Sequence, residues 1–441
     1  MRMNMIREPA RDVPVIHEAD ICVIGGSCTG VFAAVRAARL GARVAIVEKQ
    51  NAFGGVATQG LVNIWHSLHD VHRKRQIIGG LTEEVIQRLR KRDAIEEESY
   101  FRLNTEELKI DLDELITEAR VTPFLHTFFA APYCRDGRLE AIVVESKSGR
   151  GAIRAQQFID ATGDGDLAAA LGLAFQVRPN LQPPSMCART LNVVGVSFQE
   201  LMWKHRDEVG LEEDWGWSTT LPGVPGGRMH AETHVFRVNC AVAEDLTRAE
   251  IEGRRQVRAY LDLAWKHTDK KPVLLGLPSY IGIRETRRFA CDHRLTEKDL
   301  LSGRVFEDAI ACGTYPVDMH HSGDKPGITF KNLDGSEITY DGRGNRRAGR
   351  WLPEGVPGPD YYQIPYRCLL AGEYPNLLLC GRAIDADEGA FGAIRVMVNL
   401  NQTGEAAGVA AWCALQAGVP VRQVNPATLR SELRKGGSAL P

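Results

Sequence analysis

A strand, a glycine-rich turn, a helix and a second strand follow one another within residues 20–48, and this succession restricts the fold most. The apolar run Ile21–Ile24 ends at a glycine pair, as a buried parallel strand does. The segment CTGVFAAVRAARLG has small and apolar residues at helical spacing and stops at Gly41, and RVAIVEK is a second apolar strand that contains Glu48 near its end. Two strands joined by a helix form a βαβ unit, so the sequence predicts an α/β domain with a parallel sheet.

The glycine turn of this unit has the composition of a dinucleotide-binding loop. It reads Gly25-Gly26-Ser27-Cys28-Thr29-Gly30. The dinucleotide pattern has glycine at 25, 27 and 30, so Ser27 departs from it. A helix N-terminus presents free backbone N–H groups and the positive end of a dipole, which together bind a pyrophosphate, and Glu48 lies where a ribose-binding carboxylate belongs. We therefore predict that a dinucleotide, NAD or FAD, binds here; the alternative is a turn without a ligand.

The rest of the chain contains two kinds of region, one with regular strand and helix patterns and one without them. Residues 80–92 and 105–120 look helical, and 123–158 read as short strands broken at 135–137 and 146–149, a β-meander within the α/β domain. Segment 376–411 returns to a strand, a glycine-rich turn and a small-residue helix from about Gly404. The irregular middle includes a polar loop stretch near 322–360. We predict a discontinuous first domain, 18–175 plus 371–430, and a second α+β domain, 176–370, that covers it.

Composition excludes several classes of protein. The chain of 441 residues has 54 Lys and Arg against 56 Asp and Glu, a net charge of −2, so no strong positive field favours nucleic acid. Its ten cysteines form no Cys-x-x-Cys pair, which gives no support to a zinc ribbon or a thioredoxin motif. The charged N-terminus does not resemble a secretory signal, and no stretch is apolar enough for a membrane span. These features predict a cytoplasmic protein.

Four segments in the expected order carry a resemblance to a known family. They are VIGGSCTGVFAAVRAARLGARVAIVEK, FGGVATQGLV at 53–62, FIDATGDGDLA at 158–168, and NLLLCGR…GAIRVMVNLNQTGEAAGVAA at 376–411. With them the chain resembles the FAD-dependent oxidoreductases of the glutathione-reductase-like superfamily, nearest to the succinate dehydrogenase/fumarate reductase-like branch. The resemblance implies a Rossmann-like FAD-binding domain, a parallel sheet plus a β-meander, followed by a substrate-binding domain.

The resemblance also implies the residues that hold FAD. The ADP half is assigned to Gly25, Gly26, Ser27, Thr29, Gly30, Glu48 and Lys49, the pyrophosphate and flavin ring to Gly54, Gly55 and Thr58, and the adenosine side to Ala161, Thr162 and Gly163. The ribityl and phosphate groups are assigned to Gly381 and Arg382, with Asp385 in place of an aspartate that relatives often have after the glycine. A second helix N-terminus at the flavin pyrimidine is assigned to Asn401, Gln402, Thr403 and Gly404. A helix N-terminus there stabilises the negative charge of reduced flavin.

Two segments of the middle region carry candidates for catalysis. The run RETRR contains Arg284 and Arg287, whose guanidinium groups suit a substrate carboxylate; the alternative is a solvated, salt-bridged face. His320, with Asp318 to orient it, is a candidate proton acceptor over the flavin, and the alternative is a loop histidine bonded to backbone carbonyls.

The other histidines predict neither a covalent flavin nor a metal site. The histidine that bonds to flavin in some relatives falls near 53–58, where this chain has none, so we expect non-covalent FAD and consider His66, His69 and His72 polar loop residues. His230 and His234 lie in HAETHVFRVNC, which reads as a strand, and four strand steps separate their rings by about 13 Å.

The sequence thus predicts a flavoenzyme that transfers a hydride between FAD and a small organic substrate, and the arginines favour one that bears a carboxylate. Only one strong dinucleotide fingerprint occurs, so the electron donor or acceptor is another protein, a diffusible molecule or oxygen, and it is not identified. The alternatives are a flavin oxidase or monooxygenase, a non-catalytic flavoprotein with structural FAD, and, last, an NAD dehydrogenase. No nucleic-acid partner and no membrane span are expected.

Overall fold

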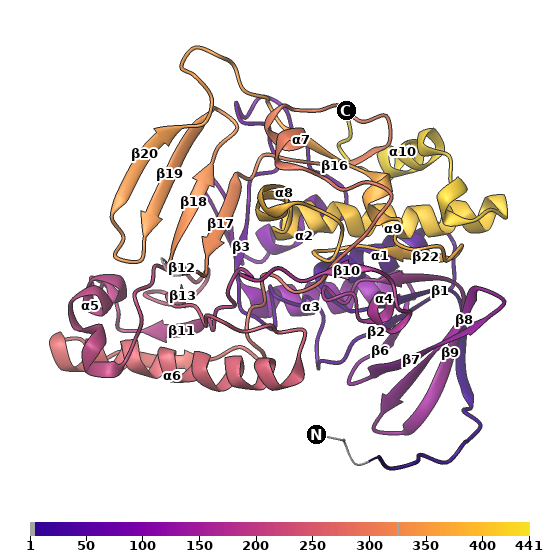
Figure 1. The fold of residues 1–441 in the computed structure, drawn as a ribbon, viewed down its shortest axis with the longest axis horizontal. Helices are drawn as coiled ribbons and strands as arrows, with labels where there is room; N and C mark the ends of the chain where they lie inside the picture. The colour runs from indigo at the N-terminus through magenta and orange to yellow at the C-terminus, as the bar shows by residue number, and fades with distance from the viewer. Residues whose placement is uncertain (1–4, 324–325) are drawn as a thin grey trace.

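The computed structural model describes residues 5–323 and 326–441, and its largest sheet combines early and late segments of the chain (Figure 1). The strands are β1 (Val15–Ile24), β2 (Val44–Val47), β6 (Thr122–Phe124), β7 (Phe128–Arg135), β8 (Arg138–Ser146), β9 (Gly149–Asp160) and β22 (Leu377–Leu379). Their order is β6-β2-β1-β9-β8-β7, with β22 also paired to β9. The pairs β6–β2, β2–β1, β1–β9 and β9–β22 are parallel, whereas β7, β8 and β9 form an antiparallel meander. The predicted parallel sheet and β-meander are both present.

Two helices from opposite ends of the chain, α1 (Cys28–Arg39) and α9 (Met397–Ala417), lie side by side next to this sheet (Figure 1). Glycines allow their backbones to approach closely: a Cβ on Gly404 would lie 2.1 Å from the carbonyl oxygen of Thr29, and one on Gly408 would lie 2.1 Å from that of Ala33. The other helices around the sheet are α2 (Leu81–Arg90), α3 (Thr105–Glu118), α4 (Asp166–Ala170), α8 (Glu388–Ile394) and α10 (Pro426–Lys435).

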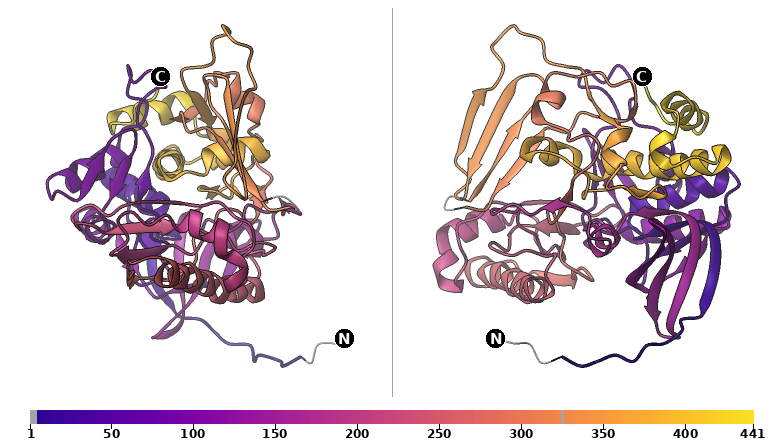
Figure 2. Two further views of the ribbon diagram at one scale, coloured as in Figure 1. Left: turned by 90° about the vertical axis from the view of Figure 1, so that its left-hand side faces the viewer. Right: turned by 45° about the vertical axis from the view of Figure 1, so that its right-hand side comes forward.

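The middle of the chain builds a second layer next to the sheet domain (Figure 2). One four-stranded sheet has the order β12-β13-β11-β14 and consists of β11 (Ala188–Leu191), β12 (Trp217–Thr220), β13 (Arg228–Ala231) and β14 (Val273–Gly276). The helices α5 (Phe198–His205) and α6 (Ala243–His267) pack against one another beneath it, and the 3₁₀ turn η1 (Arg206–Val209) follows α5. A second, antiparallel sheet contains β17 (Val317–His321), β18 (Gly327–Lys331), β19 (Ser336–Asp341) and β20 (Arg346–Arg350).

Smaller elements complete the fold. They are β3 (Ile64–Trp65), β4 (Ile95–Glu97), β5 (Phe101–Leu103), β10 (Phe175–Gln176), β15 (Arg288–Phe289), β16 (Ala309–Gly313), β21 (Tyr362–Pro365), α7 (Glu297–Leu301), η2 (Tyr366–Leu369) and η3 (Val421–Gln423). One hydrophobic core joins α1 and α9 to residues of β16 and β21. Part of the expected second domain therefore packs in the same core as the first, and the proposed domain bounds remain a prediction.

Two of the structural expectations were wrong. The stretch 322–360, expected to be polar loop, contains β18, β19 and β20, because Thr, Ile, Tyr and Phe alternate with polar residues there and pair as a meander; residues 324–325 lie outside the described residues. HAETHVFRVNC is not a continuous strand, since β13 ends at Ala231 and the chain beyond it is irregular up to α6.

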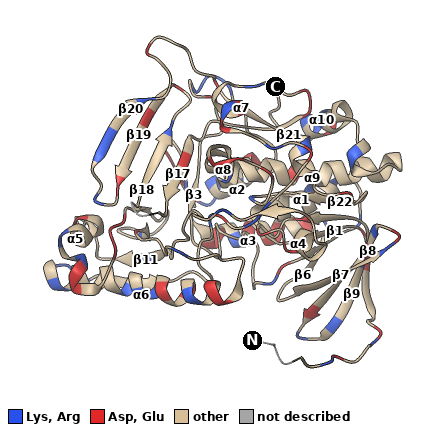
Figure 3. Ribbon diagram, in the orientation of Figure 1, with Lys and Arg blue, Asp and Glu red and all other residues tan. Residues whose placement is uncertain are grey.

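Acidic and basic residues are interspersed over the elements rather than separated by sign (Figure 3). The ten cysteines are all free thiols. Among the helices that the structure describes, none has both the length and the apolar character that crossing a membrane requires.

Candidate functional site

A cavity of about 680 Å³ begins where the parallel strands end and continues into the second layer. Gly25 follows β1, Glu48 follows β2 and Ala161 follows β9, and all three line it. Because the parallel strands run in one direction, their carboxyl ends meet at a single edge, where ligands of open α/β sheets bind. The far end of the cavity is lined by aromatic and charged residues of the second layer, namely Trp215, Trp217, Tyr315, Ile328, Phe330, Arg284, Asp318 and His320.

The glycine turn holds the N-terminus of α1 against this cavity. Gly25 has a φ of +100°, which favours glycine, and a Cβ on Gly30 would lie only 1.9 Å from the carbonyl oxygen of Gly25. Ser27, which departs from the glycine pattern, is the N-cap of α1, and its hydroxyl accepts a hydrogen bond of 3.4 Å from the Gly30 N–H. The departure therefore caps the helix and leaves its first turn facing the cavity.

Glu48 ties the second strand to the same turn. Its carboxylate accepts hydrogen bonds from the backbone N–H of Gly26 at 2.6 Å and of Gln50 at 2.8 Å. Both Glu48 and Lys49 line the cavity, so a carboxylate and an ammonium group lie beside the helix N-terminus. This is the arrangement that the ribose and adenosine of a dinucleotide require.

The structure brings most of the predicted cofactor residues to the cavity. Those that line it are Gly25, Ser27, Thr29, Glu48, Lys49, Gly54, Gly55, Ala161, Thr162, Gly163, Gly381, Arg382 and Asn401. Those that do not are Gly26, Gly30, Thr58, Asp385, Gln402, Thr403 and Gly404. Thr58 donates its hydroxyl proton to the carbonyl of Phe53 at 2.5 Å, which supports the loop behind the lining residues.

The second helix N-terminus lies seven residues earlier than the sequence suggested. α9 begins at Met397 and not near Gly404, which instead packs against α1. Its N-cap, Val396, provides no side-chain hydrogen bond to the first turn, and Val396, Met397 and Asn401 line the cavity. The expected location was wrong because a helix that is buried all round lacks the periodicity that marks its start.

Asp385 was expected to contact a ribityl or phosphate hydroxyl, and its actual contacts lie elsewhere. Its carboxylate accepts from the backbone N–H of Cys291 at 3.2 Å and lies 3.8 Å from Arg294. Arg382 does face the cavity, and its guanidinium donates to Asp164 at 2.5 Å.

Two arginines and one aspartate meet at the far end of the cavity. Arg284 donates to the carbonyl of Pro183 at 2.7 Å and to the hydroxyl of Ser185 at 2.8 Å. Arg395, which precedes α9, donates to Asp318 at 2.8 Å. Burial, together with the nearby Arg395, lowers the pKa of Arg284 to about 10, so it stays cationic at neutral pH. Among the side chains that line this end, two cations face one carboxylate.

His320 lies beside this group. Its Nε2 is 3.3 Å from Asp318 Oδ1, and its ring meets the ring of His234 edge to face at 4.9 Å. Burial, and then the charge of Arg284, hold the pKa of His320 well below its usual value, so the imidazole is neutral. His234 is fixed in turn by Asp214, whose carboxylate is 2.7 Å from His234 Nδ1.

Arg287 is the predicted catalytic residue that the structure places elsewhere. It forms an ion pair of 3.1 Å with Asp166, lies over the ring of Phe175 and does not line the cavity. Residues 283–287 belong to no helix or strand, so arginines three positions apart need not share a face. The salt-bridge interpretation therefore applies to Arg287, whereas Arg284 lines the cavity.

Sequence reasoning missed three neighbours of this group. Arg395 lies in a segment that the sequence assigns to the cofactor. Tyr315 immediately precedes the PVDMHH run, and Asp214 lies more than a hundred residues before His320. Tyr315 donates its hydroxyl proton to Asp318 at 2.7 Å. The sequence marks Tyr315 and Asp214 by no motif, because folding alone brings them to His320.

The three histidines after the 53–62 loop have different surroundings. His66 lines the cavity and packs on the Tyr315 ring at 4.1 Å, and burial lowers its pKa to about 4. The carbonyl of His69 accepts from Thr314, and His72 is exposed, 3.3 Å from Asp360. Of the three, His66 alone lines the cavity.

The cavity suits FAD by shape and by chemistry. Two helix N-termini, those of α1 and α9, open into it, and neither has an acidic side chain in its first turn to occupy the free N–H groups. The first suits a pyrophosphate, and the second suits the electron-rich pyrimidine edge of a flavin. Asn401 lines the cavity, and neither atom of its buried amide has a hydrogen-bond partner, which leaves both a donor and an acceptor for that edge.

Comparison with known proteins gives one match along most of the chain. The family model described as FAD dependent oxidoreductase matches residues 20–433. Dihydrolipoyl dehydrogenase from Trypanosoma brucei brucei is 36% identical over 69 residues, 14% of each chain. Soluble pyridine nucleotide transhydrogenase from Chromohalobacter salexigens is 32% identical over 155 residues, 34% of this chain and 31% of the relative. The chain thus matches less than a third of the length of either relative.

Solved structures give longer but more distant similarity. A geranylgeranyl bacteriochlorophyll reductase-like protein from Thermoplasma acidophilum has a TM-score of 0.47 at 12% identity, over 95% of this chain and 83% of that one. The p-nitrophenol 4-monooxygenase from Pseudomonas putida has a TM-score of 0.42 at 12% identity, over 63% of this chain and 71% of that one.

Proposed function

The chain belongs to the family of FAD-dependent oxidoreductases, and from this premise we propose that it transfers a hydride between FAD and a small organic substrate bearing a carboxylate. It is an enzyme, and its cofactor is FAD. The observation that carries the substrate proposal is the far end of the cavity, where Arg284 and Arg395 face the single carboxylate of Asp318. A cationic end that lies out of bulk water favours an anionic ligand.

The residues at this end of the cavity have separate roles in the proposed reaction. Arg284 and Arg395 bind the substrate carboxylate and fix the reacting carbon, and the walls of Trp215 and Trp217 exclude water. Bound FAD supplies a two-electron acceptor or donor. The neutral imidazole of His320 accepts the proton that an oxidised substrate loses, or returns it in the reverse direction.

The cofactor is held by the strand-end residues. We assign the pyrophosphate to the first turn of α1 with Arg382, the ribose to Glu48 and the pyrimidine edge to the first turns of α9 with Asn401. We also propose non-covalent attachment and kinship with the succinate dehydrogenase/fumarate reductase-like branch. The kinship rests on the four sequence segments quoted above.

The test is anaerobic reduction of the purified holoprotein by a panel of small hydroxy, amino and saturated carboxylic acids, each paired with its methyl ester. We expect loss of the visible flavin absorbance with acids and not with their esters. Equal bleaching by acid and ester would contradict the carboxylate proposal.

Repeating the assay in air identifies the electron acceptor. Peroxide as product indicates an oxidase, and stoichiometric oxygen consumption with a hydroxylated product indicates a monooxygenase. Flavin that no reduced substrate reduces, and that no oxidised substrate reoxidises after chemical reduction, would show that FAD is structural.

A further inference from the structure

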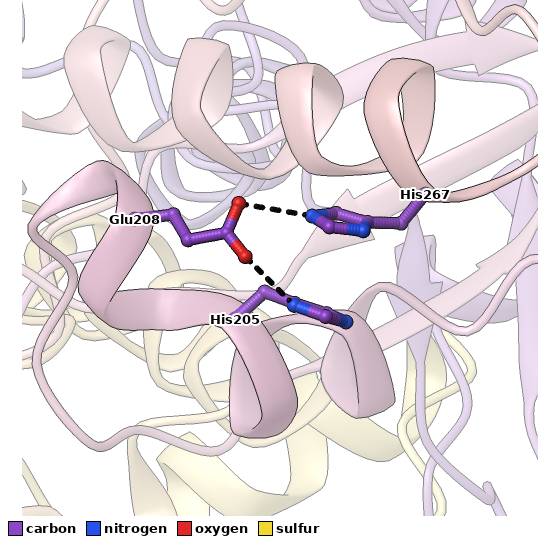
Figure 4. A group of neighbouring side chains, drawn as sticks. All are labelled: His205, Glu208 and His267. Atoms are coloured by element: carbon purple, nitrogen blue, oxygen red, sulfur yellow. Dashed lines mark hydrogen bonds and ion pairs between the residues drawn. The ribbon is translucent and has the colours of Figure 1, made fainter.

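A second group of metal-ligating side chains lies outside the cavity, where α5 and α6 end near one another (Figure 4). His205 is the last residue of α5, Glu208 belongs to η1, and His267 is the last residue of α6. In the described part of the chain, these three form the single group of His, Cys, Asp and Glu close enough to share an ion. None of them lines the cavity, so the proposed reaction makes no use of them.

Both imidazoles point a nitrogen at the same carboxylate (Figure 4). Glu208 Oε1 is 2.9 Å from His205 Nδ1, and Glu208 Oε2 is 3.0 Å from His267 Nε2. The two rings are stacked, with centroids 3.7 Å apart and planes inclined by 14°. One ligand atom of each residue lies within 4.8 Å of the other two. Two nitrogens and one oxygen therefore surround a single point at the surface of the α5–α6 pair.

We propose that His205, Glu208 and His267 form a binding site for a divalent transition metal of the zinc class. Two imidazoles and one carboxylate are a ligand set that zinc takes in proteins, and three protein ligands leave a position for water. When the metal binds, it replaces the hydrogen bonds between the histidines and the carboxylate. His205 Nδ1 and His267 Nε2, which now face Glu208, then each donate a lone pair to the metal.

Lys266 competes with a metal for the carboxylate. Its Nζ lies 2.6 Å from Glu208 Oε2, but its side chain is 66% exposed and is free to turn into solvent. Removing the lysine therefore frees an oxygen and a negative charge for the ion. This gives the proposal a variant that strengthens binding, which a simple loss of folding cannot imitate.

The site also has a structural consequence. A metal here would join the C-terminal ends of α5 and α6, and the chain leads directly from η1 to Trp215 and Trp217 in the cavity wall. Binding of the ion is therefore expected to raise the melting temperature of the protein without changing its flavin spectrum.

The experiment titrates tag-free, chelator-treated holoprotein with Zn²⁺ by isothermal calorimetry and with Co²⁺ by visible absorbance. We expect one equivalent to bind. His205→Gln and His267→Gln each weaken Zn²⁺ binding by at least about 10-fold to 100-fold. That is the loss caused by replacing a residue that only hydrogen-bonds a metal ligand, so loss of a ligand costs at least as much. Lys266→Ala tightens Zn²⁺ binding. The control His72→Gln, at an exposed histidine beside Asp360, leaves the affinity unchanged.

All variants are first checked for full flavin absorbance and an unchanged far-ultraviolet spectrum, so that a folding defect is recognised. Absence of saturable Zn²⁺ binding to the parent protein would overturn the proposal. Equal affinity in the parent, His205→Gln and His267→Gln would overturn it too, since the ion would then bind elsewhere.

Discussion

Two arginines of the RETRR run, Arg284 and Arg287, allow a direct test of the substrate site. Arg284→Met removes a guanidinium group that lines the cavity, whereas Arg287→Met removes one that does not line it and is paired with Asp166 of the cavity wall. The two substitutions have the same chemistry and lie three positions apart. A difference between them therefore reports on the position of the charge and not on composition.

The size of the effect follows from the bonds that Arg284 can offer. Two contacts, to Pro183 and Ser185, use Nη1, which leaves the rest of the fork for a ligand. A charge-assisted hydrogen bond contributes about 1.5–3 kcal/mol, and loss of one partner of a buried pair costs about 2–5 kcal/mol. We take about 3 kcal/mol, which corresponds to roughly 140-fold weaker binding.

The assay is a titration of the oxidised holoprotein with the best carboxylate from the reduction panel, followed by the change in flavin absorbance, together with kcat/KM under turnover. Arg284→Met is expected to lower both the affinity and kcat/KM by that factor, and Arg287→Met to change either by less than about 3-fold, because its guanidinium group does not line the cavity. Equal losses in both variants, or an unchanged Kd in Arg284→Met, would refute the carboxylate assignment.

Three further predictions concern the proton acceptor, the glycine turn and a buried ion pair. Burial and Arg284 keep the pKa of His320 well below its usual value, so the neutral base persists on acidification, and kcat/KM stays level as the pH falls through about 6.5, where an exposed imidazole becomes protonated. Gly30→Ala places a Cβ 1.9 Å from the backbone oxygen of Gly25, and we expect loss of FAD from the purified protein, measured as the ratio of flavin to protein absorbance. Burial raises the pKa of Glu405, 3.4 Å from Arg36, to about 8; above that pH Arg36→Met leaves a buried carboxylate without its cation and lowers the free energy of unfolding by about 3–5 kcal/mol in denaturant titrations.

Each of these has its own control and contrary outcome. An acid limb centred near pH 6.5 would show that His320 titrates as an exposed imidazole does. Gly349→Ala, where a Cβ meets no atom within 4 Å and φ is not positive, should retain FAD, and a fully loaded Gly30→Ala would contradict the proposed turn geometry. Arg39→Met removes a more exposed pair with Glu84 on the same helix and should cost less than about 1 kcal/mol; an equal cost would contradict the argument from burial.

The parts of the fold that the sequence predicted are those fixed by local pattern. The glycine turn, the carboxylate at Glu48 and the meander turns at 135–137 and 146–149 each depend on a few neighbouring residues, and the structure has them at those positions. The start of α9 was misplaced because that helix is buried on nearly all sides. Periodicity carries no signal in such a helix.

The substrate end could be predicted only in fragments. Arg284 and His320 were identified by residue type, but Arg395 joins them from a distant segment, and Asp214 approaches through His234. Which of two arginines in an extended run faces the cavity depends on the register against Pro183 and Ser185, a tertiary property that a single sequence does not record.

The central claim, that this cavity holds FAD without a covalent bond, is tested most directly by the visible spectrum of the purified protein before and after heat precipitation. We predict a flavin spectrum whose chromophore passes entirely into the supernatant and is identified there as FAD. Colour that stays with the precipitate would contradict non-covalent attachment and direct attention to His66, which lines the cavity. A colourless protein that takes up no added FAD would contradict the account as a whole.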